Sequence, residues 1–382
     1  MPHSQAPIAL LASARVPKGY LRDPAFIYRC ENLGHALRAA GYRVDLAHPW
    51  NWRVPATLGS ALFHRPRQSF RLWRLVRRLR AMGAKLIADV DDLVFDERLA
   101  RYSPAVRNKR RPLWWQQRLF REHHAAIKWF DHITVSTDVL REHAHRCFPG
   151  KPVTVLPNSV HWHWRREPNL AEAVSPELGV TPLPSSPASH AELVGKALDG
   201  QVQGGSQGAK IITYLPGTRS HDRDFALIAE PLTRFLRTHP EVHLRITGPV
   251  EFRLDVPPAQ LEHGEKVPFA AYAEKFRGVW VNLAPLEDTP FNACKSALKA
   301  IEAGYWGIPT ICSPNPDYAR FAEAGALVAH DAAAWFARLE RLLDVDEYRR
   351  VTSDLRAKTL QLADVHLQAD RFVHEVLGRA VS

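Results

Sequence analysis

Short apolar runs alternate with amphipathic stretches along the first 160 residues. The apolar runs cover residues 8–13, 43–48, 60–65, 85–92, 132–136 and 153–159. Between them, apolar positions recur with helical spacing over residues 24–40, 68–82 and 113–129. This alternation predicts β-α-β units that build a parallel sheet.

A second alternating series follows an interruption rich in Pro, Gly, Ser and Gln. Its apolar runs cover residues 210–217, 242–249, 279–286 and 309–314, its helices 224–238 and 292–304, and a helical tail 333–377. We therefore predict an α/β protein with two tandem doubly wound Rossmann-like domains, an N-terminal one (1–165) and a C-terminal one (210–382). Residues 166–209 are expected to be a linker or mobile insertion. Because ligands of such sheets bind beyond the carboxyl ends of the strands, we expect the two domains to face a cleft.

The positive charge of the chain is concentrated in its first part. The 382 residues carry a formal charge of +11, but residues 1–165 hold 28 Lys and Arg against 12 Asp and Glu, a net charge of +16. Such a surplus favours an anionic partner. No aromatic-basic RNA motif or recognition-helix pattern accompanies it, so nucleic acid is not the expected partner.

Residues 65–83 contain seven Arg and no acidic residue, with apolar side chains interleaved. A basic amphipathic helix of this kind is typical of proteins that lie on an anionic membrane surface. The other interpretation is an ordinary domain helix with a basic outer face. Four widely spaced cysteines and the lack of a basic region before the first apolar run predict a cytoplasmic protein, peripheral on the inner face of the cell membrane under the first interpretation.

Residues 288–311 hold the densest group of candidate binding residues. On a helix that begins near Asn292, the side chains of Lys295, Lys299 and Glu302 share one face, with Ser296 beside them. A helix N-terminus with two lysines attracts phosphate, and a carboxylate one turn further accepts hydrogen bonds from sugar hydroxyls. The alternative is a solvated Lys/Glu helix face.

Residues 214–225 form a second strand-turn-helix segment. The turn contains Gly217 and Thr218, and the residues that follow include His221, Arg223 and Asp224. Arginine forks and a helix N-terminus both suit a pyrophosphate. A capped helix with exposed arginines is the alternative.

Three carboxylates, Asp89, Asp91 and Asp92, follow the strand at 85–92. Clustered carboxylates suit acid/base catalysis or a hard cation, and they also cap helices. We favour catalytic or acceptor-side carboxylates and expect no metal. Arg29, on the first predicted helix, and Arg65, at the end of the strand at 60–65, are candidates for the acceptor or phosphate side, or for structural roles.

The run from 285 to 317 resembles the donor-site region of bacterial glycosyltransferases of the GT-B fold, family 4, in particular those that build surface polysaccharides. Glu302, Ala303, Gly307 and Pro309 match that family's E-A-x-x-x-G-x-P segment. The resemblance implies that Glu302 holds the donor ribose. One position departs from the pattern, because Cys294 stands where the family has a glutamate, and Asn292 or Lys295 is the candidate replacement.

Two further segments share the resemblance: residues 217–225 are similar to a G-T-x-S/T-H-D-x-D-F stretch of the polysaccharide-building subset, and residues 89–92 to a D-x-D-D segment. The resemblance implies transfer of a sugar from a nucleotide-sugar to a glycan or lipid-linked acceptor, with retention of configuration and no cofactor or divalent metal. The alternatives are a GT-B-fold nucleotide-sugar epimerase and an inactive glycan-binding subunit of a polysaccharide assembly complex.

Overall fold

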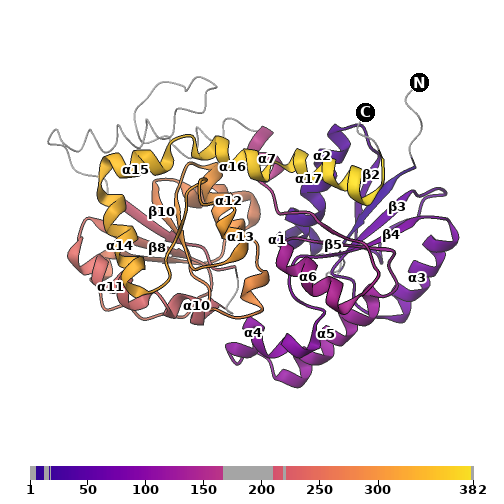
Figure 1. Ribbon diagram of the computed structural model, residues 1–382, viewed down its shortest axis with the longest axis horizontal. Helices are drawn as coiled ribbons and strands as arrows, with labels where there is room; N and C mark the ends of the chain where they lie inside the picture. The colour runs from indigo at the N-terminus through magenta and orange to yellow at the C-terminus, as the bar shows by residue number, and fades with distance from the viewer. Residues whose placement is uncertain (1–5, 13–16, 18, 167–209, 218–220, 380–382) are drawn as a thin grey trace. The chain divides into compact units, whose positions relative to one another are not determined.

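The computed structural model describes residues 6–12, 17, 19–166, 210–217 and 221–379. These residues divide into two compact units (Figure 1). Unit 1 takes in residues 1–162, 293–296 and 363–382, and unit 2 takes in residues 163–292 and 297–362. The predicted linker or insertion at 166–209 lies outside the described residues, apart from residue 166.

Unit 1 is built on a six-stranded parallel sheet in the order β2-β1-β3-β4-β5-β6. The strands are β1 (Ile8–Leu11), β2 (Val44–Ala47), β3 (Ser60–His64), β4 (Lys85–Val90), β5 (His132–Val135) and β6 (Val153–Val155). All six lie within the predicted apolar runs. Buried β1 aligns with strands on both sides, Leu10 standing opposite Leu46 and Leu62, which explains why its sequence is continuously apolar.

Helices connect these strands. They are η1 (Tyr20–Arg22), α1 (Pro24–Phe26), η2 (Ile27–Glu31), α2 (Asn32–Ala39), α3 (Phe70–Ala81), η3 (Glu97–Tyr102), α4 (Pro104–Arg107), α5 (Leu113–Ile127), α6 (Asp138–Cys147) and α7 (Trp162–Arg166), which crosses into unit 2. The predicted helix at 24–40 is continuous, but its middle segment η2 is a π-helix. The wider turn of a π-helix is common at functional sites.

Unit 2 repeats the architecture with the strand order β12-β11-β10-β7-β8-β9, again all parallel. Its strands are β7 (Lys210–Tyr214), β8 (Val242–Thr247), β9 (Leu261–Gly264), β10 (Val279–Ala284), β11 (Thr310–Cys312) and β12 (Ala326–Val328). The short edge strands β9 and β12 were not predicted. Each has only three or four residues, too few for an apolar alternation to stand out.

The helices and turns of unit 2 are α10 (Asp222–Ala226), α11 (Ala229–Thr238), η7 (Pro258–Gln260), η8 (Phe269–Ala271), η9 (Ala273–Phe276), η10 (Asn292–Cys294, of which the last two residues count with unit 1), α12 (Leu298–Tyr305), α13 (Pro316–Ala319), α14 (Ala332–Leu343), α15 (Val345–Thr352) and α16 (Leu355–Ala363). The single helices predicted at 224–238 and 292–304 are each broken in two. Because of the second break, Lys295 and Ser296 lie between η10 and α12 and not on a helix.

The end of the chain returns to unit 1. Helix α17 (Val365–Arg371) and η11 (Phe372–Val376) follow α16, and Figure 1 shows α17, in yellow, beside α2, in indigo. Phe372 and Val376 are fully buried in one apolar cluster with Ile8, Leu10 and Leu62. This differs from the predicted division, which assigned everything after residue 210 to the C-terminal domain. Helical periodicity showed that the tail was amphipathic but not which core its apolar face joins.

Candidate functional site

In unit 2, the strand order reverses between β7 and β10, because the connections from β7 run toward β9 and those from β10 run toward β12. Ligands of doubly wound sheets bind at the carboxyl ends of the strands beside such a reversal. The predicted residues Gly217, His221, Arg223 and Asp224 follow β7, and Asn292 follows β10. The sequence therefore places five candidate residues after the two strands that flank the reversal. Thr218 lies outside the described residues.

Asp224 is the centre of a buried hydrogen-bond network in this unit. Its Oδ2 lies 2.7 Å from Nδ1 of His221, and its Oδ1 accepts hydrogen bonds from the backbone N–H of Glu287 (2.8 Å) and from Nδ2 of Asn292 (3.3 Å). A carboxylate beside Nδ1 favours the tautomer of His221 that carries its proton there. Asp224 thus joins the segment after β7 to the segment after β10.

Arg223 makes an ion pair with Glu287, at 2.7 Å between Nε and Oε1. The arginine is half exposed and the glutamate largely buried. Glu287 was not predicted as a site residue. It stands in the sequence Pro-Leu-Glu-Asp just after β10, and only the fold shows that this acid faces the arginine expected to bind pyrophosphate.

Lys299, on α12, reaches the end of β7. Its Nζ donates a hydrogen bond to the carbonyl oxygen of Leu215 at 2.6 Å and lies 5.9 Å from the centre of the Tyr214 ring. A partly buried ammonium at the strand reversal provides positive charge where an anionic ligand would bind.

Glu302 lies one turn further along α12 and is only 5% exposed. Its Oε2 accepts a hydrogen bond from the hydroxyl of Tyr272 at 3.0 Å. Tyr272, which follows η8, was not predicted either. It lies 30 residues from Glu302 in a segment without regular periodicity, so the sequence contained no signal that would have paired the two.

The prediction that Lys295, Lys299 and Glu302 share a helix face is wrong for Lys295. Helix α12 begins at Leu298, and only Lys299 and Glu302 lie on it. No side chain within the helix caps its start. Instead, the backbone N–H of Ala297 donates to Oδ2 of Asp317 at 2.7 Å, an acid that lies on α13.

Lys295 and Ser296 belong to unit 1. Nζ of Lys295 lies 3.6 Å from Oδ1 of Asp92, and Oγ of Ser296 accepts a hydrogen bond from Nδ2 of Asn158 at 2.7 Å. The neighbouring carbonyl of Cys294 accepts a hydrogen bond from Thr137. Burial raises the pKa of the Cys294 thiol to about 12, so this residue does not supply the negative charge of the glutamate that it replaces.

In unit 1, Asp89 and Arg29 form a buried ion pair. Nε and Nη2 of Arg29 contact the two carboxylate oxygens of Asp89 at 3.1 and 2.6 Å, and both side chains are about 1% exposed. His64 and Thr134 also contact this carboxylate, at 2.9 and 2.7 Å. Burial by itself would raise the pKa of Asp89, but Arg29 and His64 outweigh it and hold the pKa well below its usual value.

Arg29 also donates to the carbonyl of Leu156 and to Oδ1 of Asn158, so it ties the π-helix η2 to the residues after β6. The catalytic role predicted for Asp89 stays a prediction. The contacts of the pair give both residues a structural task.

Arg65 likewise pairs with the other two predicted carboxylates. Its Nε contacts Oδ1 of Asp91 at 2.5 Å, and its Nη2 contacts Oδ2 of Asp92 at 2.7 Å. Burial would raise the pKa of Asp91, but Arg65 and His64 lower it below its usual value. The two arginines and three aspartates that the sequence singled out are therefore each other's partners.

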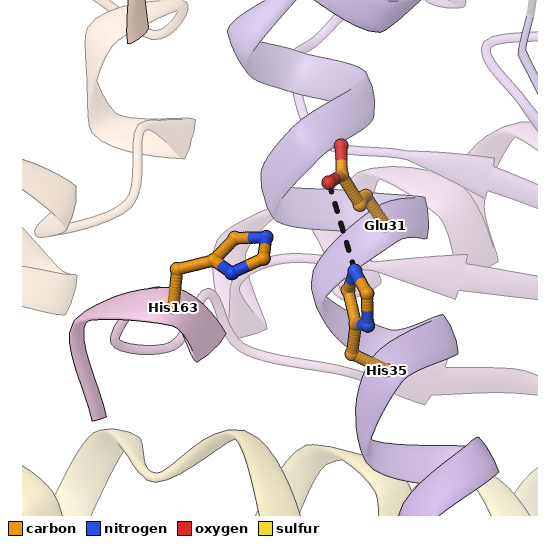
Figure 2. A group of neighbouring side chains, drawn as sticks. All are labelled: Glu31, His35 and His163. Carbon is orange, nitrogen blue, oxygen red and sulfur yellow. Dashed lines mark ion pairs between the residues drawn. The ribbon is translucent and has the colours of Figure 1, made fainter. Parts of the chain in front are cut away.

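Helix residues Glu31 and His35 form an ion pair in unit 1, with 3.7 Å between Oε1 and Nε2 (Figure 2). They lie four residues apart, on η2 and α2. His163, also drawn there, is the first residue of unit 2. Within unit 1 this pair offers two ligands, fewer than the three that a protein supplies to a catalytic zinc, so we assign it no metal.

Unit 1 also has a hollow of about 350 Å³ where β1, β2 and β3 end. Buried Ala12, Phe63 and Leu72 contribute to its apolar lining, and Trp50, which is 38% exposed, stands at its edge. Its polar lining residues are His48, Arg67, Gln68, Ser69 and Glu122. An aromatic ring beside several planar polar side chains suits a small polar ligand with an apolar face. No signal in the sequence indicated that these residues surround a ligand site.

No protein-family model matches the chain, and no curated protein matches it in sequence. Solved structures do share its fold. WaaG, a glycosyltransferase involved in lipopolysaccharide biosynthesis, matches 97% of this chain with 100% of its own length, at a TM-score of 0.58 and 11% identity.

Two larger enzymes match 84% of this chain. One is TarM of S. aureus, solved as a mutant in complex with UDP and α-GlcNAc-glycerol (TM-score 0.52, 9% identity), and the other is the pneumococcal O-GlcNAc transferase GtfA, solved with UDP and GlcNAc (TM-score 0.51, 12% identity). The chain spans little more than half of these two proteins, 55% and 57% of their lengths. The likenesses and the two parallel sheets confirm the GT-B fold.

Proposed function

We propose that the protein is a glycosyltransferase that binds its nucleotide-sugar donor in unit 2, at the carboxyl ends of β7 and β10. The observation that carries the proposal is the arrangement around Asp224 and α12. His221, Asn292 and the Arg223–Glu287 pair gather around Asp224 after the two strands, and α12 brings Lys299 to the end of β7. Departure of a nucleoside diphosphate requires neutralisation of developing negative charge, which Lys299 and Arg223 would supply. The GT-B fold, and the UDP in the TarM and GtfA structures, support this reading.

The test is a thermal melt of the wild type and of Lys299→Ala with UDP, GDP, dTDP and CMP. A ligand at a hundred times its Kd stabilises the folded state by about 2.7 kcal/mol, which corresponds to a rise in Tm of roughly 5–10 °C. We expect one nucleotide to raise the Tm of the wild type and to have much less effect on Lys299→Ala. Lys358→Ala is the matched control, because Lys358 donates to the carbonyl of Ser353 on the surface of unit 2. A wild type that responds to none of the four would refute the donor site.

We propose further that the acceptor is a glycan or lipid-linked glycan of a bacterial surface polysaccharide, and that one of its sugar rings binds in the hollow of unit 1 beside Trp50. The support is the lining of the hollow, the likeness to WaaG and the sequence resemblance. The experiment follows transfer of labelled sugar from the selected donor into a cell-envelope glycolipid extract. We expect Trp50→Ala to lower transfer while the nucleotide-induced rise in Tm is unchanged; equal transfer by the variant would exclude the hollow.

We propose retention of anomeric configuration and turnover without a divalent metal. Metal independence is supported by the pairing of Asp89, Asp91 and Asp92 with Arg29 and Arg65. These ion pairs leave little net negative charge to attract a cation. Turnover should be the same with EDTA as with Mg²⁺ or Mn²⁺, and NMR of the product should show the configuration of the donor.

We also propose that the protein is cytoplasmic and docks on an anionic membrane through α3. In the part of the chain that the structure describes, no helix has the length and hydropathy to cross a bilayer. The apolar stripe of α3 (Leu72, Val76 and Leu79) is buried in unit 1, so the basic side that includes Arg71, Arg74, Arg77 and Arg78 faces outward. Phe70 and Trp73 are 69% and 36% exposed among these arginines. Arginines attract anionic head groups, and aromatic rings favour the membrane interface.

Flotation with vesicles of phosphatidylglycerol or of phosphatidylcholine tests the docking. We expect binding to the first alone, and loss of binding when the four α3 arginines are replaced by Gln. Arg349→Gln with Arg350→Gln, on α15 of unit 2, is the control. Equal binding to both lipids would contradict the proposal, and salt-sensitive binding to RNA instead would favour a nucleic-acid partner.

A further inference from the structure

Tyr272 stands out among the residues near the proposed donor site because the function described above gives it no task. Its hydroxyl donates to Oε2 of Glu302 at 3.0 Å. Glu302 is buried on α12, three residues after Lys299. A buried carboxylate needs a hydrogen-bond donor, and the one that Tyr272 supplies comes from outside the helix.

The ring of Tyr272 is held by an aromatic cluster. It stacks on Phe269 (centroids 5.9 Å apart, planes at 12°) and on Trp164 (6.4 Å, 13°), and the edge of Phe276 meets it at 5.7 Å. Trp164 also stacks on Tyr305 of α12 at 6.0 Å. Because the ring is packed on several sides, the position of its hydroxyl is fixed relative to α12.

The proton stays on Tyr272. Burial and the neighbouring Glu302 raise the pKa of its hydroxyl well above the usual value. The hydroxyl therefore keeps the proton that it donates to Oε2 of Glu302. A hydrogen bond to an ionised group contributes more than a neutral one and has a narrower geometry.

We propose that Tyr272 is a positioning residue for the nucleotide: its hydroxyl holds the Glu302 carboxylate in the orientation that accepts hydrogen bonds from the ribose hydroxyls of the donor. The inference rests on the proposed function and deepens it by adding the ribose contact that the sequence resemblance implies for Glu302. It makes the affinity for the ribose depend on a residue that itself does not have to touch the ligand.

The test compares Tyr272→Phe, which removes only the hydroxyl, with the wild type in calorimetric titrations. The probes are the nucleotide selected by the melting screen and its 2′,3′-dideoxy form. We expect the Kd of the normal nucleotide to rise about tenfold, as for the loss of a hydrogen bond to a charged group. The dideoxy form has no ribose diol, so its Kd should be nearly the same for both proteins.

Tyr305→Phe is the matched control. The hydroxyl of Tyr305 belongs to the same cluster, but it donates to the carbonyl of Trp164 (2.6 Å) and accepts from Arg356 (2.7 Å). We expect this variant to melt at a lower temperature without a change in nucleotide Kd. Removing Tyr272's hydroxyl in a Glu302→Ala background should have no further effect on the Kd, because the residue acts through Glu302.

The outcomes separate the two proposals. A wild type that binds none of the nucleotides refutes the donor site itself. A wild type that binds, with a Tyr272→Phe variant of equal Kd, refutes the positioning role alone. An equal loss for the normal and the dideoxy nucleotide also refutes it, because the effect would then be a general loosening of unit 2.

Discussion

At the scale of single residues, the charges of unit 1 are matched inside the protein. Asp89 was recognisable from the sequence as one of three acids after a strand, but its partner Arg29 is 60 residues away. Only the order of the strands and the π-helix η2 bring the two together. The sequence therefore identified both charged groups, whereas their pairing depends on tertiary structure, which no local spacing encodes.

Replacing Asp89 by Asn should be strongly destabilising. The change leaves the guanidinium of Arg29 buried without its counter-charge, and the removal of one partner from a buried ion pair typically costs about 3–5 kcal/mol. The loss in the free energy of unfolding is measured by denaturant titration, with the hydrogen exchange of the β3 and β4 amides as the probe of unit 1. Asp138→Asn is the control, because its pair with Arg141 is exposed and should contribute under about 1 kcal/mol. A similar small loss for Asp89→Asn would mean that water reaches the pair.

His132 should make the stability of the protein depend on pH. Burial lowers the pKa of its imidazole to about 4 in the folded protein, from about 6.5 in an unfolded chain. The unfolded state thus takes up a proton first as the pH falls. The stability from this residue is complete above pH 6.5 and is lost as the pH falls toward 4.

The measurement for His132 is the Tm at pH 7.5 and at pH 5. His132→Gln should show a smaller fall in Tm between the two than the wild type does, whereas exposed His145→Gln should show the same fall as the wild type. An unchanged pH dependence in His132→Gln would assign the acid sensitivity to other groups.

At the scale of elements, the sequence predicted where helices and strands occur better than where they begin. The run from 292 to 304 has continuous helical spacing, yet the helix begins only at Leu298. The reason is an interaction from another element, because Asp317 accepts the N–H of Ala297. The start of α12 decides that Lys299, and not Lys295, lies on the helix at the candidate site. This boundary could not be predicted from the sequence, because it depends on a contact with another element. Lys299 and Glu302, by contrast, were correctly placed one turn apart.

Asp317→Ala should loosen the start of α12 and weaken nucleotide binding there. Loss of a carboxylate that accepts from a helix N-terminus costs about 0.5–2 kcal/mol. Hydrogen exchange over residues 297–301 should accelerate, and the nucleotide-induced rise in Tm should shrink. Asp331→Ala removes the corresponding cap of α14, where Oδ1 of Asp331 accepts from Ala334. Asp331→Ala should lower the stability of the protein without changing nucleotide binding. If Asp317→Ala also lost stability but bound the nucleotide normally, the start of α12 would not contribute to the binding site.

At the scale of the whole molecule, two parallel sheets followed from the alternation of apolar runs and helical stretches. The destination of the tail did not, because a helix that is apolar on one face fits either unit. Val365, Phe372 and Val376 are buried in the core of unit 1, in one apolar cluster with Ile8 and Leu10 of β1. Unit 1 therefore takes its core from two stretches of the chain that lie far apart in the sequence.

Phe372→Ala separates the observed division of the chain from the predicted one. Truncation of a buried Phe to Ala typically costs about 3–5 kcal/mol, and the loss should fall on the unit to which the side chain belongs. We expect hydrogen exchange to accelerate in β1 and β3, with β7 and β8 unchanged and the nucleotide-induced rise in Tm kept. Phe235→Ala, in the core of unit 2, should accelerate hydrogen exchange in β7 and β8 and leave β1 and β3 unchanged. Acceleration confined to β7 and β8 in Phe372→Ala would restore the tail to the C-terminal domain. With the expected result, the helical segment that contains Phe372 stabilises unit 1, the unit that contains β1.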